Sequence, residues 1–178
     1  MRTLLAILAA GATLVVGVAA CGDDESGSSS AATGTQDAAA TTTAGGERSA
    51  ETARKRRGKG IKVMSSRYGR MLFDSKGRAI YLFTREKGSR SRCYGQCAVA
   101  WPPVFTSGRP RARSGVDQDL LGKTRRRDGR RQVTYNGHPL YYYISDVRSG
   151  QVTCQNVVEF GGTWLVVNPA GDAITAPR

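Results

Sequence analysis

The hydrophobic pattern of residues 61–178 has a period of two rather than 3.6, which is typical of β-strands. A strand, a turn and a second strand follow one another three times, at 70–73, 74–77 and 79–83, at 131–135, 136–137 and 140–144, and at 163–167, 168–171 and 173–175. The second turn, Asn136-Gly137, is the strongest signal, because tight hairpin turns need residues that tolerate positive φ. The pattern therefore predicts three β-hairpins.

Helical periodicity is scarce along the same stretch. Residues 93–100 are compatible with about two helical turns, which Pro102 and Pro103 would stop. Residues 117–121 are compatible with a single turn, with Asp117 as its cap and Gly122 at its end. We expect a mainly β fold with one or two short helices.

Two stretches of the chain read as copies of one another. Tyr81-Leu82-Phe83-Thr84-Arg85-Glu86 corresponds to Tyr141-Tyr142-Tyr143-Ile144-Ser145-Asp146, with an aromatic residue two positions and a carboxylate five positions after the first Tyr. Each copy is followed about twenty residues later by a Trp, Trp101 or Trp164. The duplication predicts one domain of two tandem repeats, at about 61–113 and 114–178.

The repeated motif suggests both a structural role and a functional one. Its eight residues are Tyr81, Phe83, Glu86, Trp101, Tyr141, Tyr143, Asp146 and Trp164. Aromatic residues two apart share a strand face, so we expect that face in the core, with the Trp of each repeat against it. A carboxylate at a strand end can accept turn N–H groups or a Tyr hydroxyl. The alternative is that the Tyr and carboxylate side chains line a ligand groove between the repeats.

The N-terminal segment predicts secretion and lipid anchoring. Residues 1–20 have an early Arg2 and a long apolar stretch, and they end in Val18-Ala19-Ala20 immediately before Cys21. This ending resembles a bacterial lipobox, in which Cys21 becomes the lipid-bearing first residue of the mature protein. An uncleaved membrane-spanning anchor is the alternative. Residues 21–60 are rich in small polar residues and are expected to form a disordered linker.

The positive charge is concentrated in the predicted domain. The whole chain has a formal net charge of +13, and residues 61–178 contain 20 Lys or Arg against 8 Asp or Glu, a net charge of +12. Such a domain attracts polyanions. Behind a secretion signal these are anionic cell-wall polymers or lipid head groups, and we expect no specific nucleic acid. The alternative interpretation is that arginine only provides solubility.

These motifs also carry a resemblance to a known family. The matching pieces are residues 74–83, 93–103, 133–143 and 160–164. The chain resembles bacterial secreted-repeat lipoproteins that share a Tyr-x-(Phe/Trp/Tyr)-x-x-Asp motif and whose function is unknown. The resemblance implies a secreted, lipid-anchored protein and brings no reaction or ligand. The first copy departs from the motif, because Glu86 stands where the family has Asp.

Three cysteines follow the one that is expected to carry lipid. We expect a disulfide between Cys93 and Cys97 in an oxidising compartment, and a bridge from either of them to Cys154 is the alternative. A second interpretation is a redox or copper site, because thiolate and thioether sulfurs suit Cu(I). Further ligands would then be Met64, Met71 and His138.

The sequence contains no recognisable catalytic signature, such as a nucleophile elbow, phosphate loop or dinucleotide fingerprint. We therefore expect neither an enzyme nor a cofactor. The sequence favours a membrane-anchored extracytoplasmic module with a binding or structural role. The alternative is a periplasmic redox or copper-binding module that uses Cys93 and Cys97.

Overall fold

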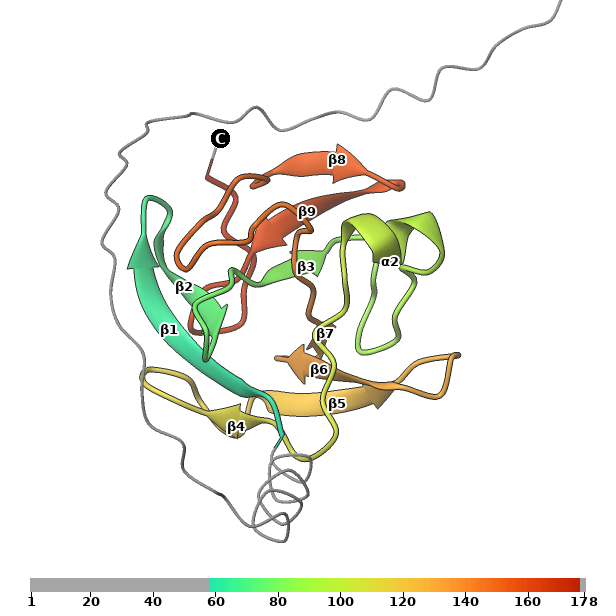
Figure 1. The fold of residues 1–178 in the computed structure, drawn as a ribbon, viewed down its shortest axis with the longest axis horizontal. Helices are drawn as coiled ribbons and strands as arrows, with labels where there is room; N and C mark the ends of the chain where they lie inside the picture. The colour runs from blue at the N-terminus through green and yellow to red at the C-terminus, as the bar shows by residue number, and fades with distance from the viewer. Residues whose placement is uncertain (1–57, 177–178) are drawn as a thin grey trace, which may run out of the picture.

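Residues 58–176 are described by a computed structural model, in which short strands surround a shared core (Figure 1). These residues form three three-stranded sheets and one short helix. The elements are β1 (Gly60–Ser66), β2 (Gly69–Asp74), β3 (Tyr81–Phe83), α2 (Gln96–Ala100), β4 (Arg111–Ala112), β5 (Leu121–Arg125), β6 (Arg131–Tyr135), β7 (His138–Pro139), β8 (Val157–Glu159) and β9 (Gly162–Val166). The mainly β prediction is confirmed. The expected signal segment, Cys21 and most of the linker lie outside the described residues.

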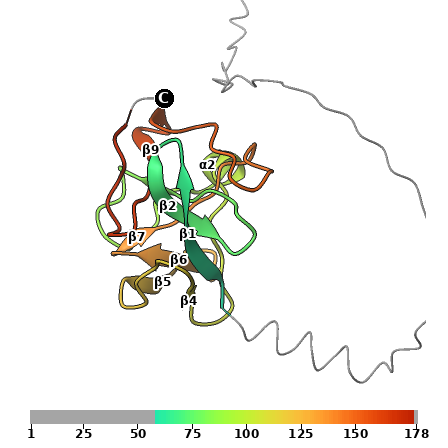
Figure 2. The same ribbon diagram turned by 90° about the vertical axis from the view of Figure 1, so that its left-hand side faces the viewer.

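The two repeats are interlocked rather than placed side by side. One sheet has the order β2-β1-β4 and another the order β5-β6-β7, so each of these comes from one repeat. The third sheet, β3-β9-β8, places β3 of the first repeat against β9 of the second. In both ribbon views β9 lies at one end of the domain, and β4 and β5 lie at the other (Figures 1 and 2).

A second connection between the repeats lies at the first Tyr of each motif. The backbone N–H of Tyr81 donates to the carbonyl of Tyr141, and the N–H of Tyr141 donates to the carbonyl of Tyr81, both at 2.9 Å. These two bonds form an isolated antiparallel bridge between equivalent positions of the two repeats. The equivalent residues therefore meet at the centre of the fold.

The first predicted hairpin forms only at its turn. Asp74 Oδ1 accepts the N–H groups of Lys76 and Arg78, and Phe73 pairs with Ala79 in a single bridge. Beyond that bridge the chain leaves β2 to pair with β9. The long partner of β2 is β1, which the sequence pattern did not identify as a strand.

The other two predicted hairpins are present. Asn136 and Gly137 have positive φ, and they connect β6 to the short β7. After β9, Val167 pairs with Ala173 across the third predicted turn. The β5–β6 pair adds a further hairpin that ends at the arginine-rich turn of residues 126–130.

The helical expectations are met in part. α2 begins only at Gln96, because Gly95 before it has a φ of 58° and cannot be part of an α-helix. The expected helical turn at 117–121 is absent. Asp117 Oδ1 instead accepts the N–H of Asp119 in a tight turn, and Leu121 already opens β5.

The core has two apolar layers, and β3 lies between them. Tyr81 and Phe83 face one layer. Ile80 and Leu82, which alternate with them along the strand, face the other. Both faces of β3 are thus buried, as all three of its residues are. No helix within residues 58–176 is long and apolar enough to span a bilayer.

Candidate functional site

The aromatic residues of the two motifs form a single cluster. Trp164 stacks in parallel on Phe83 with ring centroids 4.1 Å apart, and on Trp101 with centroids 4.2 Å apart. The order Phe83–Trp164–Trp101 alternates between the repeats. Tyr81 meets Trp101 edge-on, and Tyr141 meets Trp164 in the same way. The expected core face is therefore present, and it is shared by both repeats.

The Tyr and carboxylate of the motif are bonded across the repeats. The Tyr81 hydroxyl donates to Asp146 Oδ2 at 2.5 Å, and the Tyr141 hydroxyl donates to Glu86 Oε1 at 2.5 Å. All four side chains are buried. Each motif thus supplies a Tyr to the other repeat's carboxylate, so neither motif is complete on its own.

Each carboxylate also holds its own loop. Asp146 Oδ1 accepts the N–H and the hydroxyl of Thr153, and Glu86 Oε1 accepts the N–H of Arg92 at 2.7 Å. Asp146 uses both oxygens, whereas Glu86 Oε2 is buried without a hydrogen-bond partner. The longer Glu side chain therefore keeps the crossed bond at the cost of one unsatisfied oxygen.

Burial changes the acidity of these groups. It raises the pKa of Glu86 above its ordinary value of 4.5 and that of Asp146 above 3.8, although hydrogen bonds oppose both shifts. Burial next to a carboxylate also raises the pKa of Tyr81 and of Tyr141. The phenols therefore stay protonated at neutral pH and act as hydrogen-bond donors.

The expected disulfide between Cys93 and Cys97 is present, with the two Cα atoms 5.3 Å apart. This pairing rules out the alternative bridges from either cysteine to Cys154. Cys154 is fully buried in the core layer that also contains the disulfide, and no cysteine within the described residues is free.

The alternative copper site is not assembled in this form of the protein. Both sulfurs of the Cys pair are bonded to each other, so neither is a thiolate ligand. Met64 and Met71 are partners across β1 and β2, and His138 lies in β7 of another sheet. The described residues contain no cluster of three or more His, Cys, Asp or Glu side chains that could hold a metal ion.

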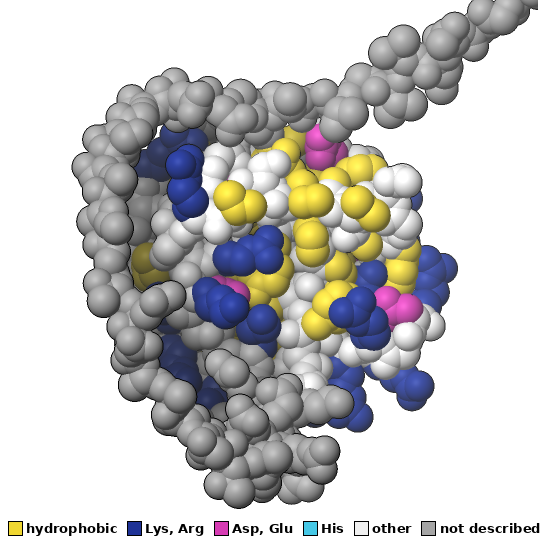
Figure 3. Space-filling view, viewed as in Figure 1, with side chains coloured by type: hydrophobic (Ala, Val, Ile, Leu, Met, Phe, Trp, Pro, Cys, Tyr) yellow, Lys and Arg dark blue, Asp and Glu magenta, His cyan; other side chains and the backbone are white. Residues whose placement is uncertain are grey.

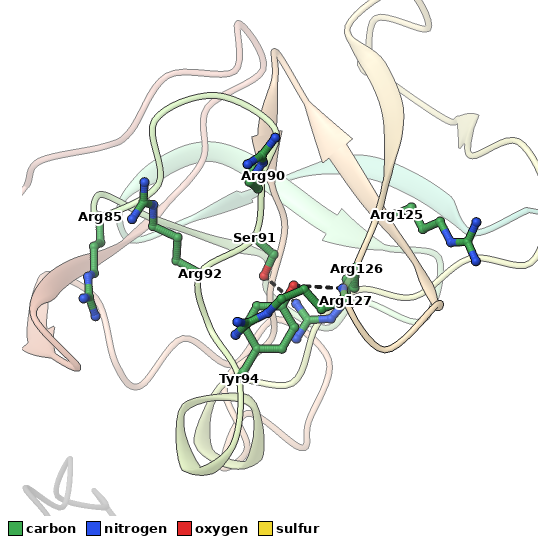
Figure 4. Close-up of a pocket in the computed structure, with 8 residues that line it drawn as sticks. All are labelled: Arg85, Arg90, Ser91, Arg92, Tyr94, Arg125, Arg126 and Arg127. Carbon is green, nitrogen blue, oxygen red and sulfur yellow. Dashed lines mark hydrogen bonds between the residues drawn. The ribbon is translucent and has the colours of Figure 1, made fainter.

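Arginine side chains line an open hollow of about 620 Å³ between the β3–α2 loop and the β5–β6 turn (Figure 4). We call it the arginine groove. Its lining residues are Arg85, Arg90, Ser91, Arg92, Tyr94, Arg125, Arg126 and Arg127. Figure 4 shows Ser91, Tyr94, Arg126 and Arg127 together at the centre, with Arg85 and Arg125 at the two sides.

Arg126 forms the floor of the groove and is only 4% exposed. Its Nη1 donates to Ser91 Oγ at 2.6 Å and to Gln132 Oε1 at 2.7 Å, and its Nη2 donates to the Cys93 carbonyl at 2.6 Å. The guanidinium carbon lies 4.3 Å from the ring centroid of Tyr94. A buried cation is thus fixed in position by neutral acceptors.

The groove floor is linked to the motif by hydrogen bonds. The Ser91 hydroxyl that accepts from Arg126 also bonds the Tyr141 hydroxyl at 2.8 Å. Tyr141 in turn donates to Glu86, whose pKa is raised by burial while the nearby Arg126 charge opposes that shift. One of the two crossed Tyr–carboxylate pairs therefore supports the groove from below.

A second hollow of about 560 Å³ adjoins the groove and shares Arg85, Arg92 and Tyr94 with it. Its other walls include Phe83 of the motif and the half-exposed Phe160. On the face shown in Figure 3, Lys and Arg side chains are spread around the domain and acidic ones are few. A basic hollow and a partly aromatic one thus form a continuous surface.

The sequence analysis located the positive charge in the domain but did not predict that one arginine, Arg126, is buried. The signal was present in the period of two along β5, because Gly122, Thr124 and Arg126 face one side and Lys123 and Arg125 face the other. The acceptors for Arg126 come from distant segments, at positions 91, 93 and 132. Because these acceptors cannot be identified from the sequence, the burial of Arg126 could not be predicted.

Comparison with known proteins agrees with the duplicated architecture. The sequence profile of a family described as a secreted repeat of unknown function matches residues 62–105 and again residues 123–168. No curated protein and no solved structure matches the chain. The two matched segments contain both strands of the central pair, β3 and β9, and the description suggests an extracytoplasmic location. The chain belongs to this family of secreted repeats of unknown function.

Proposed function

We propose that this protein is a lipid-anchored, non-catalytic module on the extracytoplasmic side of the cell membrane that binds phosphate-bearing polyanions in the arginine groove. The observation that carries the proposal is the convergence of Arg126 and Arg127 on Tyr94 within a hollow bordered by further arginines. The ending Val18-Ala19-Ala20-Cys21 supports the lipid anchor. The burial of the motif Tyr and carboxylate groups in mutual bonds supports a role other than catalysis for them.

Phosphate is the chemistry that suits such a groove best. Guanidinium groups bind phosphate oxygens through paired, charge-assisted hydrogen bonds. The hollow is larger than a single small anion requires, which favours several charges on one chain. Polyol phosphate occurs both in anionic wall polymers and in phospholipid head groups, so these two sources share the recognised chemistry.

Charge removal at the groove is expected to weaken binding at the site itself. The test uses the full chain with Arg85, Arg90 and Arg92 replaced by Gln, titrated with a glycerol-phosphate polymer at 50 and 200 mM salt. We expect the affinity to fall about tenfold or more below that of wild type. The slope of log affinity against log salt concentration should correspond to the release of about two to three fewer counterions. Vesicles with anionic head groups form a parallel arm that identifies the source of the phosphate.

The matched control removes the same charge elsewhere. Arg109, Arg111 and Arg113 are exposed and lie outside the groove, so their triple Gln variant is expected to bind within about twofold to threefold of wild type. Equal losses in both triple variants would show attraction to net charge alone and would contradict a binding site. No binding by the wild type to polymer or vesicles would also contradict the proposal.

A further inference from the structure

The buried Arg126 retains donor capacity that no described residue uses. A guanidinium has five N–H donors, and three of those on Arg126 have acceptors in Ser91, Gln132 and Cys93. Its Nε atom is buried without a hydrogen-bond partner. A buried, charged donor that lines an open groove and lacks an acceptor is a feature that an anionic ligand would satisfy.

The Asp128 carboxylate lies next to this donor. Its Oδ2 lies 3.5 Å from Arg126 Nε, which is an ion-pair distance without hydrogen-bond geometry, and the side chain is 42% exposed. This is the one salt bridge found within residues 58–176. The other oxygen, Oδ1, accepts the N–H of Arg130 and holds the turn between β5 and β6.

A phosphate group could make better use of this corner than the Asp128 carboxylate does. The guanidinium carbon of Arg127 lies 4.0 Å from the Tyr94 ring centroid, and the Tyr94 hydroxyl accepts the Arg127 N–H at 3.2 Å. The same ring therefore orients two adjacent arginines. A phosphodiester offers two free oxygens, one for Arg126 and one for Arg127, whereas one oxygen of the Asp128 carboxylate already accepts the Arg130 N–H.

We propose that Asp128 is an internal competitor, whose carboxylate covers the free edge of Arg126 in the unliganded protein and is displaced by a phosphate group of the bound polyanion. This inference rests on the proposed function and adds an anchoring subsite made by Arg126, Arg127 and Tyr94. It also gives a role to Asp128, the acidic side chain that pairs with Arg126 of the groove floor. The negative charge of Asp128 lowers the affinity for anions in general. A phosphate group displaces the carboxylate more readily than a more weakly binding anion does, so Asp128 makes the site more selective for phosphate.

The test replaces Asp128 with Asn in the full chain. The Asn side-chain oxygen can still accept the Arg130 N–H, so the turn is kept while the charge is removed. We expect D128N to bind glycerol phosphate and its polymer about threefold to tenfold more tightly than wild type. We expect wild type to bind acetate much more weakly than it binds phosphate. In D128N the ratio of the phosphate affinity to the acetate affinity should be smaller.

The matched control is D119N, which removes the same charge at an exposed position outside the groove. We expect its affinity to stay within about twofold of wild type. If D128N binds no more tightly than D119N while wild type binds the polymer, the competitor role is overturned and the proposed function stands. If no form binds phosphate, both fall together.

Discussion

Replacing Trp164 with Ala is expected to lower the free energy of unfolding by about 3–5 kcal/mol. Trp164 is fully buried between Phe83 and Trp101, with Tyr141 against its edge. The substitution removes an indole from the centre of a cluster that both repeats build, and close-packed neighbours cannot fill the space. Such a loss is a large part of the 5–15 kcal/mol that typically stabilises a domain.

Urea unfolding of the full chain, followed by tryptophan fluorescence and far-UV circular dichroism, measures this loss. The control is Val158→Ala on neighbouring β8, where the side chain is 75% exposed, and we expect a change within about 0.5 kcal/mol. A loss below about 1 kcal/mol for the Trp164 variant would mean that the repeats are stable without their shared aromatic stack. The claim that contacts between the interlocked repeats stabilise the domain would then be wrong.

Replacing Arg126 with Gln is expected to cost about 2–4 kcal/mol of stability. The change leaves the Cys93 carbonyl and the Gln132 side chain without the donor they share, and it removes the Arg126 bond to Ser91. The loss is smaller than the sum of three buried bonds, because a desolvated charge is also removed.

The adjacent Arg125 provides a matched control for this experiment. Its side chain is exposed at the end of β5, so R125Q is expected to change the free energy of unfolding by no more than about 0.5 kcal/mol. Equal effects of the two substitutions in thermal or urea unfolding would show that the burial of Arg126 contributes nothing. The groove floor would then lack the rigidity on which the proposed subsite depends.

The sequence alone was sufficient to predict local structure where the chemistry was local. Asn136-Gly137 adopts the positive φ angles that its composition predicts, and the Cys93–Cys97 pair closes a loop of neighbours. The shared core face of Tyr81 and Phe83 follows from strand periodicity alone. In each case the interacting residues are close in the sequence, or the alternation of side chains along a strand determines which face they share.

What could not be predicted depends on partners far apart in the chain. Tyr81 and Asp146 are 65 positions apart, and nothing local indicates that each Tyr bonds to the other repeat's carboxylate. β3 pairs with β9 rather than with β2, and Leu72 of β2 donates its N–H to the carbonyl of Val167, just after β9. The inward Arg126 is explained only by acceptors from three other segments.

This arrangement separates what the repeated motif does from what the groove is proposed to do. The motif joins the repeats through buried contacts, whereas exposed arginines face the solvent on adjoining loops. The two are connected through Tyr141 and Ser91, whereas the Tyr81 hydroxyl donates to Asp146, and neither of these two residues lines the groove. Tyr81 therefore permits the two roles to be examined separately.

The most direct test of the account is the affinity of the Tyr81→Phe full chain for the glycerol-phosphate polymer, measured at a temperature where circular dichroism shows it folded. The variant loses the hydroxyl that bonds Asp146, so we expect it to be less stable by about 1–3 kcal/mol. Its affinity is nevertheless predicted to remain within about twofold of wild type. A loss of tenfold or more in the folded variant would place the motif in the binding site and contradict the account.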